Sequence, residues 1–176
     1  MEMQTAATPG PEEARATYAA VREAKPEAII VYCSDPRFQT AFDEFIQKEL
    51  GLAKGQFMPL IIGGGAGVLG HPEQLPKEFK FLKERFELYR EVFPSLRRVV
   101  LINHEDCRYY EFLKTKLIGF LGPRFVISPE HARDDLALVS KAFKHLLPHL
   151  GFAVEFFYAR FADAQRSRIF FEKVQI

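Results

Sequence analysis

Two short stretches of the chain carry side chains that can bind a metal ion. The first contains Cys33, Asp35 and Arg37, and the second contains His104 and Cys107. Thiolate and imidazole ligands in a tetrahedral shell are typical of zinc, and three protein ligands leave a fourth position for water or a carboxylate. We therefore predict one divided Zn²⁺ site formed by Cys33, His104 and Cys107. Asp35 is the nearest candidate for the fourth position, and Arg37 is its natural ion-pair partner.

Both stretches follow apolar runs that indicate buried strands. Residues 28–33 read Ala-Ile-Ile-Val-Tyr-Cys, and residues 98–103 read Arg-Val-Val-Leu-Ile-Asn. A third run, residues 57–62, is predicted as a strand although Pro59 cannot donate to a ladder.

The predicted strand at residues 57–62 runs into a glycine-rich loop that includes Gly65, Ala66 and Gly67. Such a loop brings the backbone close to a small ligand and can point N–H groups at an anion. The alternative is a tight turn before the next helix. We predict that Gly65, Ala66 and Gly67 bind substrate, because the loop follows the same kind of strand end as Cys33 and His104. No Lys-Ser or Lys-Thr follows the loop, so the phosphate-loop pattern of nucleotide-binding proteins is not met.

The strands alternate with segments of helical spacing. Helices are predicted at residues 11–25, 38–50, 76–93, 107–118 and 129–147, with Asp106 as a cap, and a hairpin at residues 153–161 and 168–174. This order predicts an α/β fold, a three-layer sandwich with a mostly parallel central sheet and an antiparallel edge strand. Ligands of open sheets gather beyond the carboxyl ends of the strands. We therefore expect Cys33, the glycine loop and His104 to meet.

Length, charge and cysteine content narrow the class of protein. The 176 residues suit a single domain at 11–176, preceded by a flexible arm at 1–10. The net charge of +1 gives no general attraction to nucleic acid or to anionic membranes. We see no signal peptide and no apolar run long enough to span a membrane, and only two cysteines occur, so we expect a cytoplasmic protein. A disulfide between the two cysteines is the alternative to a metal site.

The two stretches together resemble the signature of the β-class carbonic anhydrases. That family has Cys-x-Asp-x-Arg followed much later by His-x-x-Cys, each at the end of a parallel strand. Here the patterns are Cys33-Ser-Asp35-Pro-Arg37 and His104-Glu-Asp-Cys107, with Gly65-Ala66-Gly67 where the family has an Ala-Gly loop. Both motifs in this order, each after a strand, make the resemblance fairly specific.

The resemblance implies a zinc-dependent lyase that hydrates carbon dioxide reversibly to bicarbonate. Zinc would be held by Cys33, His104 and Cys107, with water or Asp35 in the fourth position. Zinc-bound hydroxide would attack carbon dioxide once Arg37 holds Asp35 as a salt-bridged pair. The family also implies a homodimer or a higher homo-oligomer. Two alternatives stay open: hydrolysis of carbonyl sulfide or carbon disulfide at the same site, and a non-catalytic zinc- or anion-binding protein with a closed ligand shell.

The sequence departs from the family at two places beside the site. Asn103 and Arg108 stand where the family has glycine, and Arg108 would bring bulk and charge toward a pocket that Phe38, Tyr109 or Tyr110 would narrow. Other features are predicted to be structural. His71 and His131 are interpreted as solvated loop residues, and His145 with His149 as a pair that Pro148 keeps from forming a second metal site.

Overall fold

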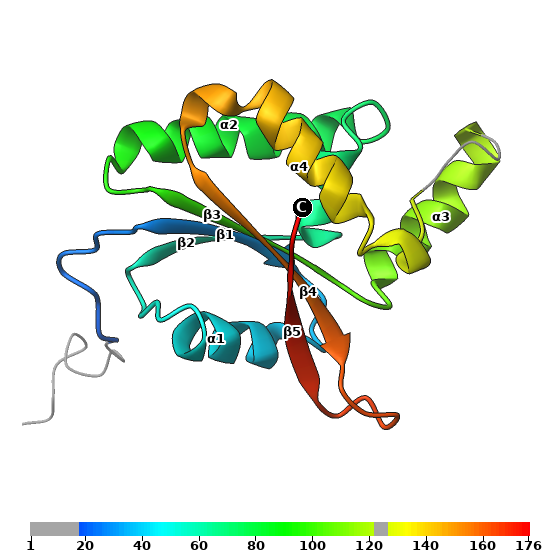
Figure 1. The fold of residues 1–176 in the computed structure, drawn as a ribbon, viewed down its shortest axis with the longest axis horizontal. Helices are drawn as coiled ribbons and strands as arrows, with labels where there is room; N and C mark the ends of the chain where they lie inside the picture. The colour runs from blue at the N-terminus through cyan, green and yellow to red at the C-terminus, as the bar shows by residue number, and fades with distance from the viewer. Residues whose placement is uncertain (1–17, 122–126) are drawn as a thin grey trace, which may run out of the picture.

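A five-stranded sheet forms the middle of the computed structural model, which describes residues 18–121 and 127–176 (Figure 1). The strands are β1 (Ala28–Cys33), β2 (Phe57–Ile62), β3 (Arg98–His104), β4 (Ala153–Phe161) and β5 (Ile169–Val174). Their spatial order is β2-β1-β3-β4-β5. Strand β1 is parallel to β2 and β3, β3 is parallel to β4, and β5 runs antiparallel to β4. The predicted mostly parallel sheet with an antiparallel edge strand is confirmed.

Helices cover both faces of the sheet (Figure 1). In the described ranges, the helices are α1 (Gln39–Lys48), α2 (Pro76–Val92), α3 (Arg108–Leu121) and α4 (Asp135–Leu146), and the 3₁₀ turns are η1 (Gly65–Gly70), η3 (Pro129–His131) and η4 (Pro148–Leu150). Helix α1 packs on one face, whereas α2 and α4 pack on the other, which gives the predicted three layers. None of the helices in the described ranges is long and apolar enough to cross a membrane.

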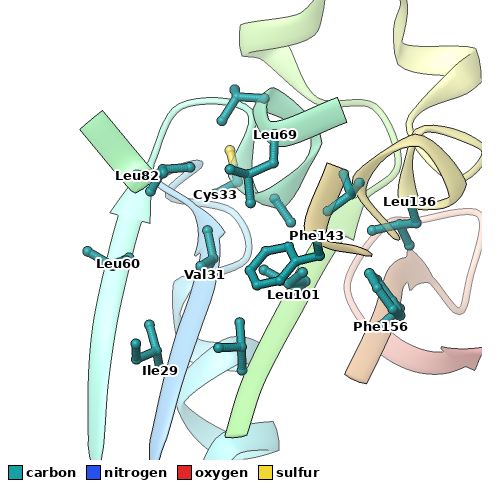
Figure 2. Packing of buried hydrophobic residues seen from close by; sticks show 14 of the residues in the cluster. Ile29, Val31, Cys33, Leu60, Leu69, Leu82, Leu101, Leu136, Phe143 and Phe156 are labelled. Atoms are coloured by element: carbon teal, nitrogen blue, oxygen red, sulfur yellow. The ribbon is translucent and has the colours of Figure 1, made fainter. Parts of the chain in front are cut away.

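Alternating side chains of β1 build a hydrophobic core on each face. Ile29 and Val31 pack with residues of α2, α4 and η1 (Figure 2), whereas Ile30 and Tyr32 pack with α1. All six residues of β1 are buried, as is typical of a central parallel strand. Burying one large aliphatic or aromatic side chain contributes about 1.5–3 kcal/mol. The two cores therefore hold the end of β1, and with it Cys33, in a fixed place.

Pro59 is compatible with a strand because β2 lies at the edge of the sheet. Among the strands that the structure describes, β2 pairs with β1 alone, and Pro59 lies opposite Ile30. An edge strand has one side without ladder partners, so the missing N–H of proline is tolerated there.

Two helix predictions were wrong in part. The predicted arm at 1–10 and residues 11–17 of the first helix lie outside the described residues, but residues 18–25 have no helical structure and are exposed. A short helix without a buried face gains too little to form in water. The predicted helix at 129–147 is broken instead into η3 and α4. The carbonyl of Ala132 accepts a hydrogen bond from Asn103 Nδ2 at 2.7 Å, and Leu136 N–H bonds to Arg133 instead.

Candidate metal centre

The topology of the sheet places two of the predicted ligands side by side. From β1 the chain passes to β2 on one side and then, through α2, to β3 on the other side of β1. The order of the strands thus reverses between β1 and β3, and ligands of open α/β sheets bind at such a switch point beyond the carboxyl ends of the strands. Cys33 is the last residue of β1 and His104 is the last residue of β3.

Cys107, which precedes α3, completes a cluster of three donors. One ligand atom from each of Cys33, His104 and Cys107 lies within 4.8 Å of the others, and each of the three residues is 2 % exposed. In the part of the chain that the structure describes, this is the only such group of His, Cys, Asp or Glu residues.

The two thiols are free and their spacing suits a zinc ion. Their Sγ atoms are 3.7 Å apart. Two thiolates bound to one tetrahedral zinc at about 2.3 Å each would lie about 3.8 Å apart. The hydrogen bond between the thiols, aided by the nearby His104, lowers the pKa of Cys33, and the same bond together with burial raises the pKa of Cys107. The opposite shifts favour one thiolate beside one thiol when no metal is bound.

The imidazole of His104 is oriented for metal binding. Its Nδ1 lies 2.8 Å from the carbonyl oxygen of Glu105, so Nδ1 carries the proton and Nε2 keeps its lone pair. Nε2 is buried and has no hydrogen-bond partner among the described residues. A ring contact with Phe38, with centroids 4.1 Å apart, supports the imidazole from one side. A histidine held in this way through its other nitrogen is the usual arrangement of a metal ligand.

Asp35 faces Arg37 in this structure. Arg37 Nη2 donates to Asp35 Oδ2 at 2.7 Å, and the side-chain Nε and backbone N–H of Arg37 both donate to Oδ1 at 3.0 Å. Burial opposes the ionisation of Asp35, but the hydrogen bonds and charge of Arg37 outweigh it and lower the pKa of Asp35. Asp35 is not part of the three-donor cluster. The pair expected from the sequence is therefore present, and ligation by Asp35 stays a prediction.

Three residues support this pair in a way that was not predicted from the sequence. Gln39 Nε2 donates to the carbonyl oxygens of Cys33 and Asp35, both at 2.8 Å, and so fixes the loop that carries the motif. Asp106 does not cap α3, because it has a positive φ of 53° and the carbonyl of Cys107 accepts the first helical bond. Its carboxylate instead binds Arg37 and Arg166. Gln39 follows Asp35 by four residues, and this spacing could have indicated a hydrogen bond between them. No local pattern in the sequence indicates the contact of Arg166.

The glycine loop forms the 3₁₀ turn η1, which packs tightly against β3. A Cβ on Gly65 would lie 2.8 Å from the carbonyl oxygen of Ile102, and one on Gly67 would collide with the hydroxyl of Tyr110. The N–H of Gly67 donates to Asn103 Oδ1 at 2.8 Å. Ala66 is fully buried. These contacts account for the small residues by packing, and substrate binding by Gly65, Ala66 and Gly67 stays a prediction.

The aromatic residues that were expected to narrow a pocket lie at different positions around the donor cluster. Phe38 contacts His104, and Tyr109 lies over Gly63 and Gly64. Tyr110 is buried, and burial followed by the charge of Asp135 raises its pKa well above the ordinary value. Arg108 is exposed.

The prediction for one histidine was wrong. His71 is 7 % exposed, and its Nε2 lies 3.1 Å from Oδ1 of the buried Asp135. The flanking proline suggested a solvated loop, but α4 covers this segment in the folded chain. His131 is exposed, as expected.

Comparison with known proteins adds to this description. No protein-family model matches the chain, and no curated protein matches it in sequence. It is similar to the crystal structure of a β-carbonic anhydrase of the fungal pathogen Aspergillus fumigatus, with 17% identity, a TM-score of 0.44 and coverage of 86% of this chain and 76% of that chain. It is also similar to β-carbonic anhydrase isoform I of the protozoan Trichomonas vaginalis, with 14% identity, a TM-score of 0.42 and coverage of 91% of this chain and 89% of that chain. A third similar structure is a tetrameric β-carbonic anhydrase of the filamentous ascomycete Sordaria macrospora, with 13% identity, a TM-score of 0.39 and coverage of 88% of this chain and 83% of that chain. These three solved structures are thus β-carbonic anhydrases, the family that the two motifs of this sequence resemble.

Proposed function

We propose that the chain is a zinc-dependent lyase that hydrates carbon dioxide reversibly to bicarbonate. The observation that carries the proposal is the convergence of two free thiols, 3.7 Å apart, with the Nε2 of His104, which has no hydrogen-bond partner in the described part of the chain. Zinc held by Cys33, His104 and Cys107 would supply a nucleophile at neutral pH, because it lowers the pKa of a water ligand to about 7.

Asp35 and Arg37 have separate roles in this proposal. Arg37 stays protonated and keeps Asp35 ionised, so the carboxylate is an acceptor for a hydrogen bond or a proton near the metal. The side chain of Asp35 is only 3% exposed, which shields this acceptor from competing solvent. Asp35 therefore orients the attacking water, and Arg37 holds Asp35 in place.

One preparation tests both the metal and the activity. Zinc content is measured by elemental analysis, and carbon dioxide hydration by stopped flow, on the same reduced sample. We expect one zinc per chain with activity, and loss of both in His104→Gln. His145→Gln is the matched control, because His145 is exposed on α4 and is not part of the donor cluster. Zinc-free wild-type protein after purification with added zinc would contradict the proposal.

The burial of the donors favours a second candidate, a zinc site without catalysis. Cys33, His104 and Cys107 are each 2 % exposed, and structural zinc sites have closed shells of four protein ligands. In that case Asp35 would leave Arg37 and become the fourth ligand. Stoichiometric zinc without hydration activity between pH 6 and pH 9 would favour this candidate over the lyase.

We further propose a homodimer or a higher homo-oligomer in the cytoplasm. Phe81, Leu88 and Val92 are exposed on α2 at spacings that place them on one helix face, and association would remove this apolar surface from water. Free thiols at the site are typical of a reducing compartment, which supports the cytoplasm as the location. Light scattering of the reduced protein measures the assembly, and a monomer at micromolar concentration would contradict it.

A further inference from the structure

Two residues beside the proposed site have unusual backbone conformations. Among the described residues, Asp106 with φ 53° and Arg166 with φ 57° are the only ones other than glycine with a positive φ. A left-handed conformation costs a residue with a side chain about 1 kcal/mol or more, and surrounding contacts must hold it in place. The two residues contact each other, since Arg166 Nη1 donates to Asp106 Oδ2 at 2.6 Å.

Arg37 connects this contact to the proposed site. Its Nη1 donates to Asp106 Oδ2 at 2.8 Å and its Nη2 donates to the backbone oxygen of Asp106 at 2.6 Å. On its other side, Arg37 binds Asp35. The guanidinium group therefore lies between two carboxylates, and the carboxylate of Asp106 lies between two guanidinium groups. These contacts form one chain of charges, Asp35-Arg37-Asp106-Arg166.

The terminal hairpin brings Arg166 to this place. Strand β4 lies beside β3 in a register that sets Ala159 opposite His104, so the hairpin loop continues past the end of β3 (Figure 1). Asp163 shapes the loop, because its carboxylate accepts the N–H groups of Ser167 and Arg168 at 3.0 and 2.8 Å. The guanidinium of Arg166 also lies 5.4 Å from the ring centroid of Phe161. The hairpin thus contributes a defined contact to the site although it carries none of the three metal donors.

We propose that Asp106 and Arg166 are positioning residues that hold the guanidinium of Arg37 in register with Asp35. This inference rests on the proposed function of the Asp35–Arg37 pair. The bidentate contact with Asp35 orients one edge of the Arg37 guanidinium, and the contacts of Nη1 and Nη2 with Asp106 hold its other edge. The side chains of Asp106 and Arg166 are 45% and 59% exposed, so the contribution of Arg166 alone is modest.

Three variants and a matched control test the proposal. Arg166→Gln removes the outer guanidinium, and Arg166→Lys restores its charge. Asp106→Asn removes the shared carboxylate but keeps a residue type that tolerates a left-handed backbone. Arg168→Gln is the control, because it removes a guanidinium from the same exposed loop and no ion pair of Arg168 is seen within the described ranges.

The first measurement is the hydrogen exchange of the Arg37 Nε–H group, followed by ¹H–¹⁵N NMR on the purified protein. We expect exchange about threefold faster in Arg166→Gln, the size typical of an exposed ion pair, and partial recovery in Arg166→Lys. Asp106→Asn is expected to raise the exchange rate of the Arg37 Nε–H group about tenfold, because a charge-assisted hydrogen bond is lost as well. Arg168→Gln should equal the wild type. Equal exchange in wild type and Asp106→Asn, or equal effects of Arg166→Gln and Arg168→Gln, would overturn the proposal.

The second measurement is kcat for carbon dioxide hydration at equal zinc content. We expect kcat to fall about threefold in Arg166→Gln and about tenfold in Asp106→Asn. If the zinc-loaded wild type shows no hydration, the proposed function fails, while the NMR comparison still decides whether Asp106 and Arg166 position Arg37. If the wild type is active and kcat is unchanged in Asp106→Asn, the positioning role is rejected.

Discussion

The side-chain amide of Asn103 accepts the backbone N–H of Gly67 at 2.8 Å and so joins the end of β3 to the 3₁₀ turn η1. Its Nδ2 donates to the carbonyl of Ala132 at 2.7 Å and to the hydroxyl of Tyr110 at 3.4 Å. Asn103 is 1 % exposed. One side chain next to His104 therefore connects three segments that are distant in the sequence. This accounts for asparagine at a position where glycine is usual in the family that the motifs resemble.

Replacing Asn103 by Ala should destabilise the fold. Two buried backbone groups, the N–H of Gly67 and the carbonyl of Ala132, would lose their partner, and each such loss costs about 1–3 kcal/mol. We expect the free energy of unfolding in urea to fall by about 2–4 kcal/mol. Gln47→Ala removes an exposed amide from α1 and should change it by less than about 0.5 kcal/mol. Equal effects of the two substitutions would show that the Asn103 contacts contribute nothing.

Asp35→Asn should keep the zinc and impair turnover, because the amide is not an ionised acceptor. The substitution should also change how stability depends on pH. The pKa of Asp35 is lowered in the folded state, so its charge stabilises the zinc-free fold fully above the unfolded value of about 4, and the gain is lost as pH falls through the folded value. Urea unfolding from pH 2 to pH 7 measures this. A stability difference between wild type and Asp35→Asn that grows as pH falls would contradict the ion pair.

Zinc binding should release about two protons at pH 8, one from the thiol pair and most of a second from a zinc-bound water with a pKa of about 7. Cys33 has a lowered pKa and Cys107 a raised one, so the metal-free pair holds a single proton. Calorimetric titration of the chelator-treated, reduced protein with zinc in buffers of different ionisation enthalpy counts the protons. Release of about three protons would mean that both thiols are protonated before the metal binds, and release of about one would mean that no water ligand ionises, as in a closed shell.

His71→Gln should destabilise the protein far more than loss of an exposed histidine. The side chains of His71 and Asp135 are 6% and 4% exposed, and leaving a buried polar group without its partner costs about 1–3 kcal/mol. His149, which lies 3.3 Å from Glu87 at the surface, supplies the control His149→Gln with an expected cost under about 1 kcal/mol. Thermal and urea unfolding of the two variants compare these values. Similar losses in both would reject a buried pair at His71.

The sequence by itself determined where the three donors lie along the chain and which elements precede them. Apolar runs of six or seven residues led directly to β1 and β3, because a central parallel strand is buried on both faces and contains few polar residues. Cys33 and His104 therefore had to lie at the same edge of a sheet. The Cys33-x-Asp35-x-Arg37 spacing also indicated the ion pair, since residues two apart in a loop can pair without help from the rest of the fold.

Only the tertiary structure decided which distant side chains meet. The contacts Arg166–Asp106, Asn103–Gly67 and His71–Asp135 each join residues at least 36 positions apart, and neither partner has a local pattern that identifies the other. Their meeting depends on strand register, on the packing of α4 over η1 and on the path of the terminal hairpin. Hydrophobic periodicity reports which face of an element is buried, but it does not report which polar groups lie opposite one another once the layers have packed.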